Sequence, residues 1–199
     1  MTSPHPPSLL SHYAVVPLAE AYLPAVMAIE SVSFGKHHWS ASSFTNELSN
    51  QMASYYVLAL PPNTPATATL PHVIAYAGSW VVLDEGHITT VASHPSFRGM
   101  ALGEMMLLQL LGWFRHRQVA NATLEVRESN AVAQALYYKY WFETRGFRKR
   151  YYQDNDEAAL LMTSPHLSDK PYEAFCSQQQ AALLAKWGVT SVTGWCSYS

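Results

Sequence analysis

The chain has 199 residues, of which 49% are hydrophobic, 13% aromatic and 13% charged, and its formal net charge is −2. This length and composition indicate one globular domain with a short appendage. The slight acidity argues against a nucleic-acid partner held by a broad basic surface. A local basic patch remains open, and the candidates are Arg145, Arg148, Lys149 and Arg150.

The sequence contains no recognisable signal for secretion, membrane insertion or metal binding. No basic segment followed by a long apolar run opens the chain, and no apolar stretch could span a bilayer, so we expect a soluble, cytoplasmic protein without a membrane partner. Cys176 and Cys196 form no CxxC pair; a disulfide between them is conceivable, although reduced thiols suit a cytosolic protein better. The histidines are scattered apart from His37 and His38 and show no HExxH spacing, so we predict no metal site.

The N-terminal part combines a polar segment with the first predicted elements. Residues 1–11 are rich in Pro and Ser and are expected to be flexible. A strand over residues 12–18 and a helix over 20–33 follow. Ser40 is a typical N-cap residue for a second helix over residues 41–48.

The middle of the chain predicts consecutive strands. Residues 55–60 and 72–83 are apolar and are separated by a turn-rich loop over residues 61–71. Residues 84–86 (Asp-Glu-Gly) give a tight-turn signal, and a strand over residues 87–93 pairs with its predecessor.

Helices and strands then alternate. A strongly apolar helix over residues 102–117 precedes a strand over 122–126 and a helix over 131–140. Strands over residues 147–152 and 158–162 close the pattern. This order predicts the α/β class, with a mixed sheet and helices on both of its faces.

The tail over residues 164–199 differs in composition from the rest. A helix is expected over residues 171–186, and Trp187, Trp195 and Tyr198 add aromatic area. The tail could pack on the domain, mediate dimerisation or stay mobile, and the oligomeric state is left open.

A glycine-rich turn leads into the helix over residues 102–117. Gly99 and Gly103 flank the turn, with the small Ala101 between them. Such a turn leaves backbone N–H groups unpaired at the positive end of a helix, which suits a diphosphate. A Walker loop is excluded because no GK[ST] follows, and the Rossmann GxGxxG is absent.

The segment RGMALG resembles the acetyl-CoA signature Q/R-x-x-G-x-G/A of the GNAT superfamily. The resemblance implies that acetyl-CoA is bound by Arg98, Gly99, Met100, Ala101, Leu102 and Gly103. Two residues depart from the usual pattern. Ala101 stands where glycine is commonest and resists positive φ, and the carboxylate of Glu104 opposes a bound phosphate.

A second motif, LEVRESNAVAQALY, follows. Glu125 lies in the predicted strand over 122–126, and Asn130 is a natural N-cap for the next helix. Tyr137 stands seven residues after Asn130, which places both on one helical face.

This string resembles bacterial RimI-type enzymes, which acetylate the N-terminal alanine of a small-subunit ribosomal protein. Residues 30–44, 82–85 and 148–162 match the same family. The resemblance therefore covers a GNAT domain over residues 12–163, with a mostly antiparallel sheet, and leaves out the tail. It implies an acetyl-CoA-dependent N-acetyltransferase that needs no metal and whose substrate is a protein N-terminus, such as that of a ribosomal protein.

The resemblance also implies residue roles. Glu125 would be the general base for the incoming amine and Tyr137 the general acid toward the CoA thiolate. Asn130 would contact the cofactor, and the backbone of Val91 and Ser93 would hold the pantetheine. A single carboxylate with a modestly raised pKa can act as general base for an α-amino group, whose own pKa is about 7.7–8.0. A lysine amine, with a pKa near 10.4, would need more help to lose its proton.

One further departure and two rival functions remain. Trp141 stands where the family usually ends its helix with a left-handed glycine, so either Trp141 adopts a strained conformation or the helix continues past it. One rival function is acetylation of a small-molecule amine. The other is a non-catalytic acyl-CoA-binding module, in which Ala101, Glu104 and Trp141 mark lost activity.

Overall fold

A single sheet organises the computed structural model, which describes residues 7–35, 38–61, 64–67 and 70–198. Within these residues the strands lie in the order β1-β2-β3-β4-β5-β7-β6. Their bounds are β1 (Ala14–Pro17), β2 (Ala53–Ala59), β3 (Val73–Val82), β4 (Glu85–Ser93), β5 (Asn121–Arg127), β6 (Glu143–Tyr152) and β7 (Glu157–Thr163). Neighbouring strands are antiparallel except β4 and β5, which run parallel. The predicted mixed, mostly antiparallel sheet is therefore confirmed.

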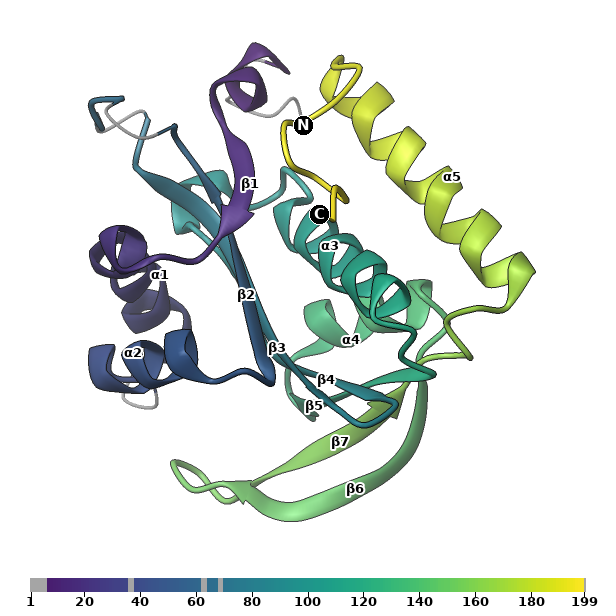
Figure 1. The fold of residues 1–199 in the computed structure, drawn as a ribbon. Helices are drawn as coiled ribbons and strands as arrows, with labels where there is room; N and C mark the ends of the chain where they lie inside the picture. Colours follow the sequence, from purple (N-terminus) through teal and green to yellow (C-terminus); the bar gives the residue numbers. More distant parts are fainter. Residues whose placement is uncertain (1–6, 36–37, 62–63, 68–69, 199) are drawn as a thin grey trace.

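Helices cover both faces of the sheet, as the order of elements predicts (Figure 1). Their bounds are α1 (Leu23–Phe34), α2 (Ala41–Ser49), α3 (Leu102–His116), α4 (Ala131–Lys139) and α5 (Lys170–Trp187), with short 3-10 turns at η1 (Pro7–His12), η2 (Glu20–Tyr22) and η4 (Pro95–Phe97). Side chains of α1 and α2 form one hydrophobic cluster with the sheet, and those of α3 and α5 belong to a second. The sheet thus lies between two apolar layers.

Local sequence signals fix several element ends. Ser40 caps α2, because its Oγ accepts a hydrogen bond from the Ser43 N–H at 3.1 Å. The β3–β4 turn is shorter than predicted. Val82 already pairs with Glu85, so only Leu83 and Asp84 lie in the loop.

Gly86 belongs to β4 rather than to the predicted turn. A Cβ at Gly86 would lie 2.7 Å from the Phe114 ring of α3. Close packing between the sheet and α3, and not turn geometry, therefore requires glycine at this position.

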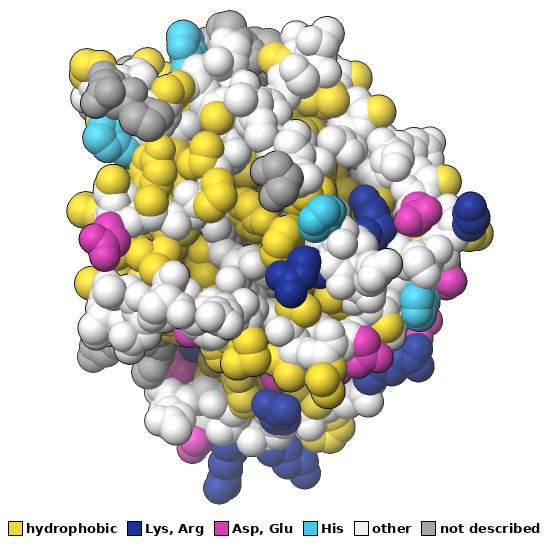
Figure 2. Space-filling model, viewed as in Figure 1, with side chains coloured by type: hydrophobic (Ala, Val, Ile, Leu, Met, Phe, Trp, Pro, Cys, Tyr) yellow, Lys and Arg dark blue, Asp and Glu magenta, His cyan; other side chains and the backbone are white. Residues whose placement is uncertain are grey.

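The outer edge of the sheet is basic. Strand β6 is the edge strand, begins four residues before the predicted range over 147–152 and carries Arg145, Arg148, Lys149 and Arg150. Figure 2 shows Lys and Arg side chains gathered at the end of the molecule that β6 forms. The charge is local, as the sequence allows.

Both chain ends are anchored where the structure describes them. Residues 7–12 form a 3-10 turn that buries Leu9 and Leu10, although composition predicts a flexible segment over residues 1–11. The earlier residues of that segment, and His37, lie outside the described residues. The expected tail helix is α5, and the tail packs on the domain beside α3 (Figure 1). Cys176 and Cys196 are free thiols.

Candidate active site

Strands β4 and β5 pair over only part of their length. The parallel ladder extends from Glu85 with Asn121 to Ile88 with Leu124. Past these residues, within the described chain, β4 pairs only with β3, and β5 only with β7. The two strands therefore diverge, and Glu125 is the first β5 residue after the point of divergence.

The unpaired part of β4 presents backbone groups toward β5. The His94 N–H donates to the Ile74 carbonyl at 2.8 Å. In an antiparallel ladder, alternate residues direct their N–H and C=O groups to the same neighbour, so Ala92 also faces β3. Val91 and Ser93 direct their backbone groups to the opposite edge, where β5 has diverged. These are the two residues expected to hold a pantetheine arm.

Most amide donors of the loop over residues 98–103 have no protein acceptor among the residues that the structure describes. Gly99 has φ +81°, and Ala101, the N-cap of α3, has φ 63° and ψ 26°. Ala101 thus adopts the left-handed conformation that alanine resists, at a cost of about 1–2 kcal/mol. In the described chain the N–H groups of residues 99–104 donate to no protein acceptor, as expected for the first turn of a helix.

The two glycines leave room for a ligand at this loop. A Cβ on Gly99 would meet nothing within 4 Å, and one on Gly103 would meet only Val91 Cγ1 at 3.9 Å. Packing of the protein therefore does not require glycine at position 103. Open amides, the positive end of α3 and the missing Cβ atoms together fit a diphosphate.

Glu104 does not direct its charge at this loop. Its Oε1 accepts hydrogen bonds from Lys139 Nζ at 2.5 Å and from the Tyr140 hydroxyl at 2.8 Å, both from the α4 end. The Lys139 ammonium offsets the negative charge. The conflict that sequence predicts between Glu104 and a phosphate is therefore reduced.

Glu125 is held by two side chains, His87 and Arg148. His87 Nε2 lies 3.0 Å from Glu125 Oε2, and Arg148 Nη1 lies 3.1 Å from Oε1. The hydrogen bond from His87 lowers the pKa of Glu125, and the charges of His87 and Arg148 add to this effect, although burial opposes it. The modestly raised pKa expected from the sequence is therefore wrong, because β4 brings a hydrogen-bonding imidazole and β6 a guanidinium to the carboxylate.

Tyr137 lies on the opposite side of the sheet from Glu125. It belongs to the same hydrophobic cluster as Leu124 and Val126, and Glu125 alternates with these two residues along β5. Burial raises the pKa of Tyr137 to about 12, and the nearby Tyr152 adds to the shift. The phenol therefore keeps its proton at neutral pH.

Asn130 caps α4, as the sequence predicts. Its Oδ1 accepts a hydrogen bond from the Ala133 N–H at 3.1 Å. The Arg127 guanidinium donates to Asp154 at 3.0 Å through two nitrogens and to Glu157 at 3.2 Å. These bonds tie the end of β5, the strand that carries Glu125, to the β6–β7 turn.

Besides Arg148, which the sequence offers only as part of a basic patch, two contributors to the site were not identified from the sequence. His87 reaches Glu125 only because β4 and β5 are neighbours in the sheet, and its own segment reads as an ordinary strand. Trp187, in the tail, donates its indole N–H to the Met100 carbonyl at 2.9 Å. No local pattern identifies either contact.

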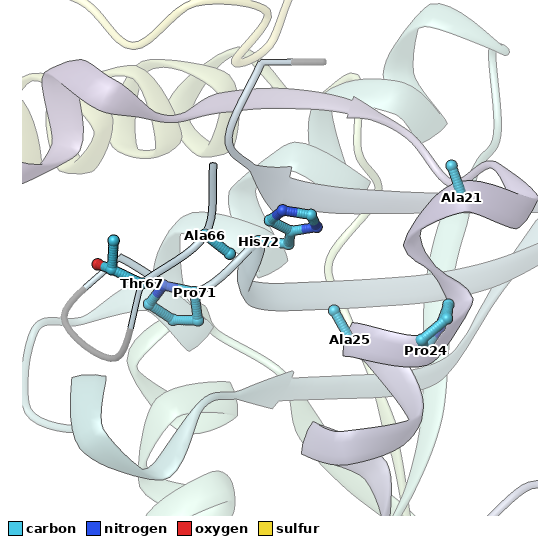
Figure 3. Close-up of a pocket in the computed structure, with 7 residues that line it drawn as sticks. All are labelled: Ala21, Pro24, Ala25, Ala66, Thr67, Pro71 and His72. Atoms are coloured by element: carbon cyan, nitrogen blue, oxygen red, sulfur yellow. The ribbon is translucent and has the colours of Figure 1, made fainter. Parts of the chain in front are cut away.

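A separate hollow of about 630 Å³ lies between the start of α1 and the β2–β3 loop. Figure 3 shows its lining residues, Ala21, Pro24, Ala25, Ala66, Thr67, Pro71 and His72. None of them belongs to the candidate site. Among the described residues no group of three or more His, Cys, Asp or Glu side chains is arranged to bind a metal, and no helix is long and apolar enough to cross a bilayer.

Comparisons with known proteins show the family and the fold. A sequence model described as "Acetyltransferase (GNAT) family" matches residues 24–142. The ribosomal protein bS18-alanine N-acetyltransferase of Escherichia coli K12 is 34% identical over 145 residues, covering 72% of this chain and 90% of that protein. The crystal structure of the ribosomal-protein-S18-alanine N-acetyltransferase from Escherichia coli has a TM-score of 0.66 and 29% identity, covering 77% of this chain and 94% of that one. A GNAT acetyltransferase from Elizabethkingia anophelis with acetyl-CoA bound shares the fold, with a TM-score of 0.59 and 15% identity, covering 77% of this chain and 98% of that one.

Proposed function

The chain belongs to the GNAT acetyltransferase family and is an acetyl-CoA-dependent N-acetyltransferase, and we propose that its acceptor is the N-terminal α-amino group of a protein, the alanine of ribosomal protein S18. Relatives named for that reaction support the choice, at 34% identity over most of their length. A ribosomal-protein substrate is made in the cytoplasm, where we expect the enzyme to act.

The cofactor is held by two sets of backbone groups. The amides of the loop over residues 98–103 bind the diphosphate, helped by the dipole of α3. The backbone of Val91 and Ser93 holds the pantetheine where β5 has diverged. The observation that carries this proposal is the loss of pairing after Ile88 and Leu124, because it frees the edge of β4 beside Glu125.

Glu125 serves as the acceptor for the amine proton. The amine nitrogen forms a bond to the carbonyl carbon of the acetyl group and loses one proton. This proton passes to the Glu125 carboxylate directly or through one water. The carbon–sulfur bond then breaks, and the CoA sulfur leaves as a thiolate. A backbone N–H on the free edge of β4 donates to the carbonyl oxygen as negative charge develops on it.

Tyr137 stabilises the leaving sulfur. With a pKa raised to about 12, the phenol stays protonated at rest and donates a hydrogen bond to the developing thiolate. A phenol of this pKa is a weaker acid than an ordinary tyrosine, so charge stabilisation contributes more than complete proton transfer. Asn130 contributes by capping α4, the helix that carries Tyr137, and its remaining amide nitrogen is proposed to contact the cofactor.

The electrostatics of Glu125 favour an α-amine over a lysine side chain. A carboxylate with a lowered pKa is a weak base. An α-amino group with a pKa of about 7.7–8.0 is partly neutral at pH 7, whereas a lysine near 10.4 is almost fully charged. The first therefore needs little help from Glu125, and the second would need far more.

Purified enzyme with acetyl-CoA and a peptide that copies the N-terminus of ribosomal protein S18 tests the proposal. Mass spectrometry is expected to show one acetyl group on the N-terminal alanine and none on internal lysines. The control is the same peptide with its N-terminus blocked. Preferred acetylation of small amines supports the small-molecule alternative, and CoA binding without transfer to either acceptor supports the non-catalytic module.

A further inference from the structure

Two tryptophans of the tail pack against the proposed diphosphate loop and the first turn of α3. The family match ends at residue 142, so the tail lies outside it. Trp187 Nε1 donates to the Met100 carbonyl at 2.9 Å, and Trp195 Nε1 donates to the Met105 carbonyl at 3.1 Å. Both bonds are buried, and the two indole rings lie 5.7 Å apart.

The carbonyl that Trp187 holds belongs to the same peptide group as the Ala101 N–H. In a trans peptide the C=O and the N–H point in opposite directions. We propose that Trp187 is a positioning residue for the cofactor diphosphate, because its indole fixes the Met100 carbonyl toward the tail and thereby turns the Ala101 N–H outward to the ligand. The inference rests on the proposed cofactor site.

The loop needs such a restraint. Gly99 and Ala101 both have positive φ, and the space around a Cβ on Gly99 is empty, so no side chain packs against that residue. Burial of Met100 anchors its side chain but does not set the orientation of the peptide plane. A buried hydrogen bond to the Met100 carbonyl does, because leaving that carbonyl unpaired is costly.

Trp195 provides a matched control within the same tail. Its indole makes the same kind of bond to the carbonyl of Met105, in the first turn of α3. The amide on the far side of that peptide group, at Met106, lies inside the helix and is used in the regular i to i−4 pattern. Loss of the Trp195 bond therefore frees no ligand-facing amide.

The experiment compares Trp187→Phe with Trp195→Phe in the full chain. Calorimetric titration with CoA is expected to show an affinity about three- to tenfold lower for Trp187→Phe, and unchanged for Trp195→Phe. Turnover of S-acetylpantetheine, which lacks the diphosphate, is expected to stay at the wild-type value in both variants. Equal CoA affinity in Trp187→Phe and wild type, equal losses in both variants, or a parallel loss with S-acetylpantetheine would overturn the proposal.

Thermal unfolding of each variant shows whether it is folded. If Trp187→Phe does not fold, incorporation of β-(3-benzothienyl)alanine at position 187 keeps the ring shape and removes only the N–H. That protein is expected to show the same selective loss of CoA affinity, and wild-type affinity would reject the positioning role. A wild-type protein that does not bind CoA would instead refute the proposed cofactor site.

Discussion

The Nε2 atom of His87 lies 3.0 Å from Oε2 of Glu125, so that an imidazole from β4 holds a carboxylate of β5 at the point where the two strands part. Arg148 reaches the other carboxylate oxygen from the edge strand β6. Three strands therefore fix the charge and the orientation of Glu125.

Replacement of Glu125 by Gln removes the proton acceptor and keeps the side-chain size. We expect kcat for peptide acetylation to fall by about 10²-fold, the lower end of the range of general base catalysis, because a carboxylate with a lowered pKa is a weak base, while CoA affinity stays unchanged. Steady-state kinetics with calorimetry measures both quantities. Wild-type turnover in this variant would remove Glu125 from the mechanism.

Replacement of His87 by Ala is expected to raise the pKa of Glu125, because the hydrogen bond from His87 is the main cause of the lowered value. A carboxyl group whose pKa is lower in the folded protein than in the unfolded chain stabilises the fold at pH values above the unfolded-state pKa. That stability is lost as the pH falls through the folded-state pKa. Carboxyl-detected NMR titration of the two proteins gives the shift directly. An identical titration in both would show that Arg148 alone controls the group.

Replacement of Tyr137 by Phe removes the donor to the leaving sulfur. We expect kcat to fall at least about tenfold, with little change in CoA affinity, because the hydroxyl acts on charge that develops during the reaction. Burial raises the pKa of the phenol to about 12, so wild-type activity is expected to show no loss from this group below pH 10. A loss of CoA affinity matching the loss of kcat would assign Tyr137 to binding instead.

Trp141 holds the end of α4 against the tail. It has φ 59°, and its ring stacks on Phe175 at 4.8 Å and 25°. Replacement by Ala loses the stacking and keeps the backbone strain, so we expect the free energy of unfolding to fall by about 1–2 kcal/mol. Replacement by Gly loses the same stacking but relieves the strain, so it is expected to destabilise less.

Urea denaturation measures these changes. The matched control is Val132→Ala, since Val132 also belongs to the α4 region but is 84% exposed. Its effect is expected to stay within about 0.5 kcal/mol. Equal destabilisation by Val132→Ala and Trp141→Ala would contradict a specific contribution of the aromatic stack.

Local patterns predicted most of the fold. The Ser40 and Asn130 caps, the helix at the glycine-rich turn and the alternation along β5 are properties of short segments, and the structure confirms them. Family resemblance supplied the residue roles, which remain predictions. The open amides around Ala101 agree with the cofactor role expected from the motif.

Long-range contacts could not be predicted in the same way. The pKa of Glu125 depends on His87 and Arg148, which reach it only after the sheet has formed. The substitution of glycine by Trp141 is explained by Phe175, a residue of the tail that the family motif does not include. The position of Trp187 beneath the loop depends on how α5 packs along α3.

Amide-resolved NMR during titration with CoA tests most directly whether the loop binds the diphosphate and places the thioester beside Glu125. Large shifts are expected for the amides of Met100 to Glu104 with CoA and small ones with S-acetylpantetheine, with Glu125 responding to acetyl-CoA. Saturable CoA binding that leaves these loop amides unmoved would contradict this expectation.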